Sequence, residues 1–328
     1  MPRRLGIIGT FVWDTVWTLG DQAAGRAFET WGGVSFSVAS AAATRPEGWE
    51  IVPIAHVGAD LVDQVHAYLD TVDGVGARDG IVAVDEPNNR VELVYTDASS
   101  RGETMRGGVP GWTWLELEPH LRGLDALYVN FLSGFEMDLR TAAAVKRGFP
   151  GFIYADLHSL FLGPPRPDGP REPRRLHRWN DWLRCFNAVQ MNEEEYTLMR
   201  GGPLGPERYP EYLLKYGDPQ AIFVTRGERG ARFVVSRGER PDMHGPGRPV
   251  RFGEVPAHPA PSGGDPTGCG DVWGAANACG LLGGMDAEEA VRRANAVAAA
   301  KLGHRGGSGL YEHLRGHRAE WGHAGLDG

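Results

Sequence analysis

Short apolar segments that each end in a glycine or a polar residue recur along the chain, and this pattern limits its fold more than any other feature. Segments with helical character, such as 34–43, 272–282 and 286–302, lie between or after them. Strands that alternate with helices of this length are typical of an α/β fold, so we predict a doubly wound, mainly parallel sheet flanked by helices. The predicted strands end at Gly9, Gly58, Asn130, Asp156, Asn192 and Thr225.

The residues at these strand ends indicate where a binding site would form, because ligands of open α/β sheets bind along the edge made by the carboxyl ends of the strands. Residues 91–96 differ from the core strands. They alternate apolar and polar side chains, which is typical of a partly exposed sheet outside the main core. Residues 17–31 have no clear helical period and could supply short strands that leave the main sheet.

Composition excludes several classes of function. A chain of 328 residues can form one large α/β domain or two ordinary ones. Its net charge of −8 argues against binding nucleic acid through a general basic field. No apolar segment is long enough to cross a bilayer, so we expect no membrane partner. The cysteines Cys185, Cys269 and Cys279 have neither paired nor zinc-binding spacing, which favours a reducing, cytoplasmic location.

The stretch from Asp265 to Asp271 is the strongest candidate for a site. A turn rich in glycine and proline precedes an apolar helix, so backbone N–H groups at the helix start can bind an anion such as phosphate. Asp271 would repel that anion, and it makes more sense as a base that takes a proton from an attacking hydroxyl. The alternative is an ordinary helix cap. A dinucleotide-binding fingerprint is a third reading, but the glycine spacing is wrong by one residue.

Several motifs in fixed order resemble the ribokinase-like (PfkB) carbohydrate kinase family, from about residue 5 to about residue 310. Asp265–Asp271 is similar to its D-T-x-G-x-G-D signature, although Pro266 departs from it. Gly9 to Asp14 is similar to its early G-x-x-x-x-D. The other matching segments are its di-glycine (Gly32-Gly33), V-G-x-D (ending at Asp60), N-x-x-E (Asn192 to Glu195) and T-x-G-x-x-G (Thr225 to Gly230).

The resemblance implies one ribokinase-like domain over residues 1–328, with a small β lid built from segments near 11–31 and 83–108. It implies transfer of a phosphoryl group from ATP to a hydroxymethyl group of a sugar or a related small molecule, with Mg²⁺. It leaves open a requirement for a monovalent cation such as K⁺, and a homodimer formed through the lid.

The resemblance also implies roles for individual residues. Asp271 would be the base, and Gly268, Cys269 and Gly270 would form the anion hole. Glu195, with Asn192, would place Mg²⁺ through water. The nucleotide would meet Thr225, Gly227, Gly230 and Asn295. The acceptor would meet Asp14, Gly32, Gly33 and Ser37.

Departures from the family pattern leave the acceptor open. Ser37 stands where many relatives carry asparagine, and Asp156–Ser159 replaces the frequent D-x-N-x-R. Trp13, Trp17, Trp31 and Arg90 could shape an unusual pocket for an aromatic or anionic acceptor. A nucleoside kinase of the same fold and a catalytically silent ligand-binding relative therefore stay open, with an NAD-dependent oxidoreductase as an outside alternative. The Pro/Arg-rich insertion at 164–178 reads as a solvated loop or a basic flap.

Overall fold

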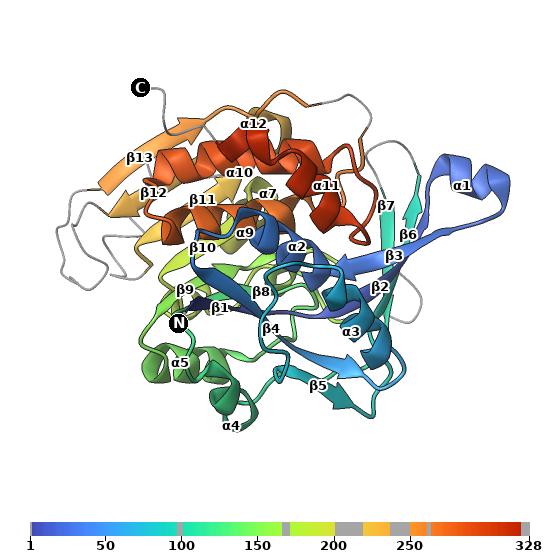
Figure 1. The fold of residues 1–328 in the computed structure, drawn as a ribbon, viewed down its shortest axis with the longest axis horizontal. Coiled ribbons are helices and arrows are strands. Elements are labelled where there is room, and N and C mark those ends of the chain that lie inside the picture. The colour runs from blue at the N-terminus through green and yellow to red at the C-terminus, as the bar shows by residue number, and fades with distance from the viewer. Residues whose placement is uncertain are drawn as a thin grey trace.

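A large, mainly parallel sheet lies at the centre of the computed structural model, which describes residues 2–96, 101–165, 171–200, 219–236, 250–260 and 264–322 (Figure 1). Among these residues the sheet has nine strands in the order β13-β12-β11-β10-β9-β8-β1-β4-β5. All neighbours from β5 to β11 are parallel, and β12 and β13 add an antiparallel edge. The predicted α/β fold is confirmed. The strands are β1 (Arg3–Ile8), β4 (Trp49–Gly58), β5 (Ile81–Val84), β8 (Ala126–Asn130), β9 (Phe152–Asp156), β10 (Ala188–Asn192), β11 (Ala221–Thr225), β12 (Ala231–Ser236) and β13 (Val250–Val255).

The predicted strand ends are also confirmed. β4, β8, β9, β10 and β11 stop at the expected residues, and Gly9 directly follows β1. The register places Asn130 beside Asp156, and Asn192 beside Thr225. These polar residues therefore share one edge of the sheet.

Two hydrophobic cores cover the two faces of the sheet because successive strand residues point to opposite sides. Ile7 and Tyr128 belong to the core under one helical layer, whereas Ile8 and Val129 belong to the core under the other. Figure 1 shows α2, α9 and α10 on one side, and α4 and α5 on the other. The first layer contains α2 (Val34–Thr44), α3 (Val62–Asp70), α9 (Cys269–Leu282), α10 (Ala287–Lys301), α11 (Leu310–Gly316) and α12 (Arg318–Gly322). The second contains α4 (Trp114–Leu117), η1 (Glu118–Leu121), α5 (Leu139–Gly148), η2 (His158–Phe161), α6 (Trp179–Leu183) and α7 (Glu193–Arg200).

Helix α9 packs close to the sheet because its inward side chains are small. A Cβ atom on Gly274 would lie 2.2 Å from Oε1 of Gln190 and 2.4 Å from the hydroxyl of Tyr128. The start of α9 is thereby held near the carboxyl ends of β8, β9 and β10.

A second, four-stranded sheet, here called the small sheet, stands at one end of the molecule (Figure 1). Its order is β3-β2-β6-β7, and helix α1 (Leu19–Ala24) connects β2 to β3. One face carries a cluster that includes Val12, Val16, Leu93 and Tyr95. The strands are β2 (Phe11–Trp17), β3 (Phe28–Gly33), β6 (Arg90–Tyr95) and β7 (Arg101–Arg106).

The insertion at 164–178 is only partly described, since 166–170 lie outside the described residues. Arg171 does not behave as part of a solvated loop. It is 7% exposed, and its guanidinium donates to the carbonyls of Ser133 and Gly163, each at 2.8 Å. None of the helices in the described parts of the chain combines the length and the apolar character that a membrane span requires.

Candidate active site

The start of α9 leaves open space beside glycine backbone. Gly268 is the N-cap residue and has φ 79°, and a Cβ atom there would lie 2.5 Å from the ring of Phe36, so glycine is required. A Cβ atom on the exposed Gly270 would meet nothing within 4 Å. The amide of Cys269 donates back to the carbonyl of Pro266 at 3.1 Å. Of the three predicted anion-hole residues, Gly270 therefore borders the open space most directly.

Asp271 lies in the first turn of α9 and is fixed by the carboxyl end of β8. Nδ2 of Asn130 donates to Oδ1 of Asp271 at 2.8 Å and to Oγ of Ser37 at 2.9 Å. Ser37 is fully buried in α2 and accepts this bond, so α2, β8 and α9 meet at Asn130. Oδ1 of Asn130 is buried and has no hydrogen-bond partner among the described residues. An acceptor oxygen without a partner at this position points to a ligand that donates.

Asp156 adds a second carboxylate behind the helix start. Nε2 of Gln190 donates to Oδ2 of Asp156 and to the carbonyl of Gly270, each at 3.0 Å. Burial raises the pKa of Asp156 well above its usual range; the charge of His158 opposes this, while the charges of Glu195 and Asp271 add to it. Burial and the neighbouring negative charges therefore favour the neutral, protonated form of Asp156.

Glu195 and Asn192 form a reciprocal cap at the start of α7. The amide of Asn192 donates to Oε2 of Glu195 at 2.7 Å, and the amide of Glu195 donates to Oδ1 of Asn192 at 2.8 Å. Oε1 of Glu195 lies 2.8 Å from Nδ1 of His158. Burial by itself would lower the pKa of His158, but the hydrogen bond and charge of Glu195, with the charges of Asp156 and Asp271, raise it to about 10. His158 is thus a cation at neutral pH.

The loop after β11 lies next to this cap. Thr225 ends β11 beside Asn192, and Gly227 and Gly230 have φ of 56° and 82°. A Cβ atom on Gly230 would lie 2.1 Å from the carbonyl of Val255, so this turn requires glycine. Arg226 pairs with Glu193 and Glu254. The two predicted nucleotide motifs are therefore brought together.

Asn295 makes hydrogen bonds within the protein at the place where α9, α10 and the end of β13 meet. Its Oδ1 accepts from Nε1 of Trp273 at 2.7 Å, and its Nδ2 donates to the carbonyl of Pro256 at 2.8 Å. The amide joins α9, α10 and the end of β13. Its contact with a nucleotide stays a prediction.

Asp14 and Gly32 lie against each other in the small sheet, because a Cβ atom on Gly32 would lie 1.8 Å from Oδ2 of Asp14. Gly33 caps α2 with φ 62°. Asp14 shares its face of the sheet with Val91, its partner in β6. The hydroxyls of Tyr95, also on this face, and Thr267 lie 3.0 Å apart. Asp14 therefore lies on the side of the small sheet that meets the lead-in to α9.

Trp13, Trp31 and Arg90 lie on the other face, since neighbouring strand residues point in opposite directions. Trp31 packs with Phe11 and Tyr68 in the main core. Arg90 pairs with Asp60 at 2.9 Å. These side chains, with Trp17, therefore lie on the face opposite Asp14, and their role in an acceptor pocket stays a prediction.

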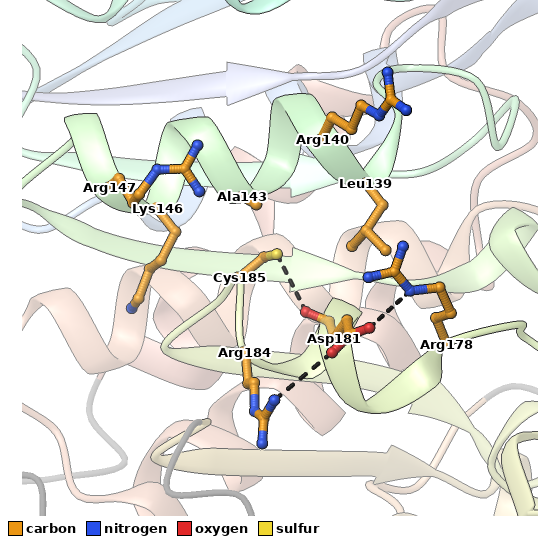
Figure 2. Close-up of a pocket in the computed structure, with 9 residues that line it drawn as sticks. All are labelled: Leu139, Arg140, Ala143, Lys146, Arg147, Arg178, Asp181, Arg184 and Cys185. Carbon is orange, nitrogen blue, oxygen red and sulfur yellow. Dashed lines mark hydrogen bonds and ion pairs between the residues drawn. The ribbon is translucent and has the colours of Figure 1, made fainter.

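A basic hollow between α5 and α6 belongs to the opposite helical layer (Figure 2). Asp181 pairs there with Arg178 at 2.7 Å and with Arg184 at 3.6 Å. None of the predicted site residues lines it. The lining residues are Leu139, Arg140, Ala143, Lys146, Arg147, Arg178, Asp181, Arg184 and Cys185.

The donor set at the strand ends fits a nucleotide phosphate and Mg²⁺. Open space over Gly270 at a helix start suits a phosphoryl group. Within the described residues, no three His, Cys, Asp or Glu side chains are close enough to bind a metal directly. Mg²⁺ usually keeps several waters and binds through one or two carboxylates together with substrate phosphates. Glu195, Asp156 and Asp271 could hold such waters.

Sequence patterns did not identify several residues of the site. Asn130 was recognised only as a strand end, Asp156 as a strand end that opens a segment departing from the family pattern, and His158 only as part of that segment. Gln190 and Lys301 carry no motif that would reveal their contacts.

Comparisons with known proteins agree with this architecture. A model described as pfkB family carbohydrate kinase matches residues 168–313. No curated protein sequence matches the chain. Among solved structures, ribokinase from Thermotoga maritima has a TM-score of 0.69 at 16% identity, over 96% of this chain and 99% of that chain.

Two further solved structures have the same fold. A putative ribokinase II from E. coli, in complex with ATP and Mg²⁺, has a TM-score of 0.71 at 19% identity, over 95% of this chain and 98% of that chain. A nucleoside kinase from Burkholderia thailandensis, in complex with inosine, has a TM-score of 0.68 at 16% identity, over 98% of each chain. The family model thus matches residues 168–313, and the fold shared with these solved kinases extends along nearly the whole chain.

Proposed function

We propose that the protein transfers a phosphoryl group from ATP to a hydroxymethyl group of a sugar or sugar-like small molecule, with Asp271 as general base and Mg²⁺ as cofactor. The observation that carries this proposal is the position of Asp271. Its carboxylate lies in the same helical turn as the open space over Gly270, and Asn130 holds its Oδ1. A base and an anion-binding helix start therefore lie side by side, as transfer to an alcohol requires.

In the proposed reaction, the acceptor O–H gives its proton to Asp271 as its oxygen bonds to the γ-phosphorus. The bond from that phosphorus to the bridging oxygen breaks, and ADP leaves with the electron pair. Bound Mg²⁺ would neutralise charge on the donor phosphates. The amide of Gly270 and the positive end of α9 would stabilise charge on the transferring group.

The residues around the base would position the two substrates. The buried Oδ1 of Asn130 would accept from an acceptor hydroxyl, and Asp14 would accept from another. Thr225, Gly227 and Gly230 would border the nucleotide beside Asn192 and Glu195. The small sheet would cover the acceptor and exclude water that competes with its hydroxyl.

A nucleoside kinase is the second candidate. Its support is the apolar face of the small sheet, where Val91, Tyr95 and Met105 lie on the same side as Asp14. An apolar face next to a carboxylate suits a ligand with a flat base and a ribose. A catalytically silent ligand-binding relative would keep this face but would not need Asp271.

The test is ADP release from ATP with Mg²⁺ across a panel of sugars, sugar phosphates and nucleosides, with release of inorganic phosphate as the readout when pyrophosphate is the donor. Asp271→Asn should lower kcat by about 10²–10⁴-fold, the usual contribution of a general base. Calorimetric ATP binding to the same variant should persist. ATP binding without acceptor-stimulated turnover would favour the silent relative, and turnover unchanged in Asp271→Asn would exclude Asp271 as the base.

A further inference from the structure

Lys301 is a buried charge that the proposed reaction does not use. It is the last residue of α10, and its side chain is 0% exposed. Its Nζ donates to the carbonyl of His304 at 2.9 Å, to the carbonyl of Asp265 at 3.0 Å and to Oδ2 of Asp265 at 3.2 Å. A buried ammonium is unfavourable unless oxygen atoms replace its lost water. This oxygen cluster is therefore built around a single positive charge.

The cluster lies directly behind the lead-in to the candidate anion hole. Oδ1 of Asp265 accepts from the amide of Thr267 at 2.9 Å, and the amide of Asp265 donates to the carbonyl of Leu302 at 3.0 Å. Burial would raise the pKa of Asp265, but the charge of Lys301 and the amides of Thr267 and Gly306 lower it. Asp265 is thus held as a carboxylate three residues before Gly268.

The same ammonium also fixes the segment that meets the small sheet. His304 is followed by Gly307 and Ser308, whose backbone amide and side-chain hydroxyl bind the backbone of Trp31 at 2.8 and 3.1 Å. Lys301 therefore joins the lead-in to α9 with the segment that supports β3. None of these contacts reaches Asp271 or the open space over Gly270. Lys301 would therefore affect the site by positioning the backbone around it.

The ring of Phe36 connects this cluster to the helix start itself. Nζ of Lys301 lies 5.6 Å from the centre of that ring, and the same ring excludes any Cβ atom at Gly268. A cation near an aromatic face is attracted by it. The ammonium, the ring and the N-cap glycine thus form one packed unit.

A monovalent cation such as K⁺, which the family resemblance leaves open, does not fit this oxygen cluster, because the ammonium already fills it. We propose that Lys301 serves as a built-in monovalent cation that holds the Asp265–Gly270 segment in its phosphate-binding conformation and makes an exchangeable cation unnecessary. Lys301 is a positioning residue in this proposal, which rests on the proposed phosphoryl transfer for its catalytic consequence.

The wild-type protein gives the first test, without any variant. Its kcat for ADP release and its melting temperature should be the same in potassium chloride and in tetramethylammonium chloride at equal ionic strength, because tetramethylammonium is too large for an oxygen cluster of this size. A clear loss of kcat in tetramethylammonium would overturn the proposal, since the site would then need an exchangeable cation.

Lys301→Ala separates a cation role from general packing. In tetramethylammonium chloride, kcat should fall by about 10²-fold, the typical effect of misplacing catalytic groups by about 1 Å. Propylammonium, which replaces the atoms that this substitution removes, should restore kcat and raise the melting temperature, and ammonium should do so in part. Lys301→Met keeps the volume but not the charge, so no cation should rescue it.

Arg293→Ala is the matched control, because Arg293 is a half-buried cation on the same helix whose Nη2 donates to the carbonyl of Thr44 at 2.9 Å. Propylammonium should restore neither kcat nor the melting temperature of Arg293→Ala. If propylammonium changes both variants equally, Lys301 is only part of a structural ion pair. Thermal melting needs no acceptor, so it tests Lys301 independently of the reaction. If propylammonium selectively stabilises Lys301→Ala but the protein phosphorylates no acceptor, Lys301 is still a built-in cation and the proposed phosphoryl transfer is refuted.

Discussion

Asn130 connects parts of the site that lie far apart in sequence. Its amide hydrogens go to Asp271 and Ser37, which lie on two different helices. A carboxylate with one oxygen held in this way presents its remaining lone pairs in a fixed direction. The family resemblance leads to Asp271, but nothing in the spacing of the sequence indicates that an amide from β8 orients it.

His158 places a positive charge among the carboxylates of the site, and its effect should depend on pH. The pKa of His158 is raised from 6.5 to about 10, so its ion pair with Glu195 stabilises the folded state fully below pH 6.5. That contribution decreases as the pH rises from 6.5 and is lost above about 10. His158→Gln should therefore lower the melting temperature most at pH 6.5 or below, with a difference that narrows up to pH 10.

The control for this prediction is Glu195→Gln, which removes the partner. In that background, His158→Gln should have a smaller effect and a weaker dependence on pH. Because 46% of the His158 side chain is exposed, water screens part of the interaction. A melting difference that stays constant from pH 6 to pH 10 would contradict the assignment.

At the scale of elements, the sequence predicts where strands end better than it predicts the side-chain contacts between elements. Alternation of apolar segments and polar ends places the ends of five core strands correctly, from Gly58 to Thr225. It cannot show that Gln190 binds the carbonyl of Gly270, because that contact depends on how closely α9 packs on β10. Nor does it show that the amide of Asn295 joins three elements.

The segment after His304 shows the same limit. It is rich in glycine and histidine, yet α11 and α12 form between residues 310 and 322. Leu310 and Leu314 are fully buried and Trp321 is 1% exposed. A few large side chains bury enough apolar surface to fix this segment, and composition averages hide them.

The start of α9 offers a prediction at the element scale. Gly270→Ala adds a methyl group that meets no protein atom within 4 Å, so the fold should tolerate it. The methyl group would instead occupy the space where the phosphoryl group is proposed to bind. We expect a higher KM for ATP and a kcat lower by about 10²-fold, as for loss of an oxyanion-type contact, with a melting temperature that does not fall, since alanine in place of a helical glycine favours the folded state.

Gly316→Ala is the control, because a Cβ atom at that position at the end of α11 also meets nothing within 4 Å. It should leave turnover unchanged and stabilise the fold by about 0.4–1 kcal/mol. Steady-state ADP release and thermal melting measure both variants. Normal turnover by Gly270→Ala would place the phosphate elsewhere.

At the scale of the whole molecule, the small sheet is attached to the main body at separate points. Asp21 pairs with Arg305, and Trp31 binds the segment that ends in Ser308. Both attachments lie on the side of α10 and its following loop. The bond between Tyr95 and Thr267 connects the small sheet directly to the lead-in of α9. We therefore predict that closure of the small sheet and the shape of the anion site are coupled through that bond.

Tyr95→Phe should uncouple closure of the small sheet from the shape of the anion site while leaving the fold intact. The substitution removes a hydrogen bond worth about 0.5–1.5 kcal/mol, which corresponds to a roughly two- to tenfold smaller closed population. Water would then reach the phosphoryl group more often. The ratio of ADP released to acceptor phosphorylated should rise, and kcat for the acceptor should fall by a similar factor.

Tyr68→Phe is the control. It removes a hydroxyl that donates to the carbonyl of Ser35 at 2.9 Å within the main body, so it should lower the melting temperature without changing that ratio. If Tyr95→Phe keeps the wild-type ratio, the small sheet does not control the access of water, and its contact with Thr267 serves stability alone.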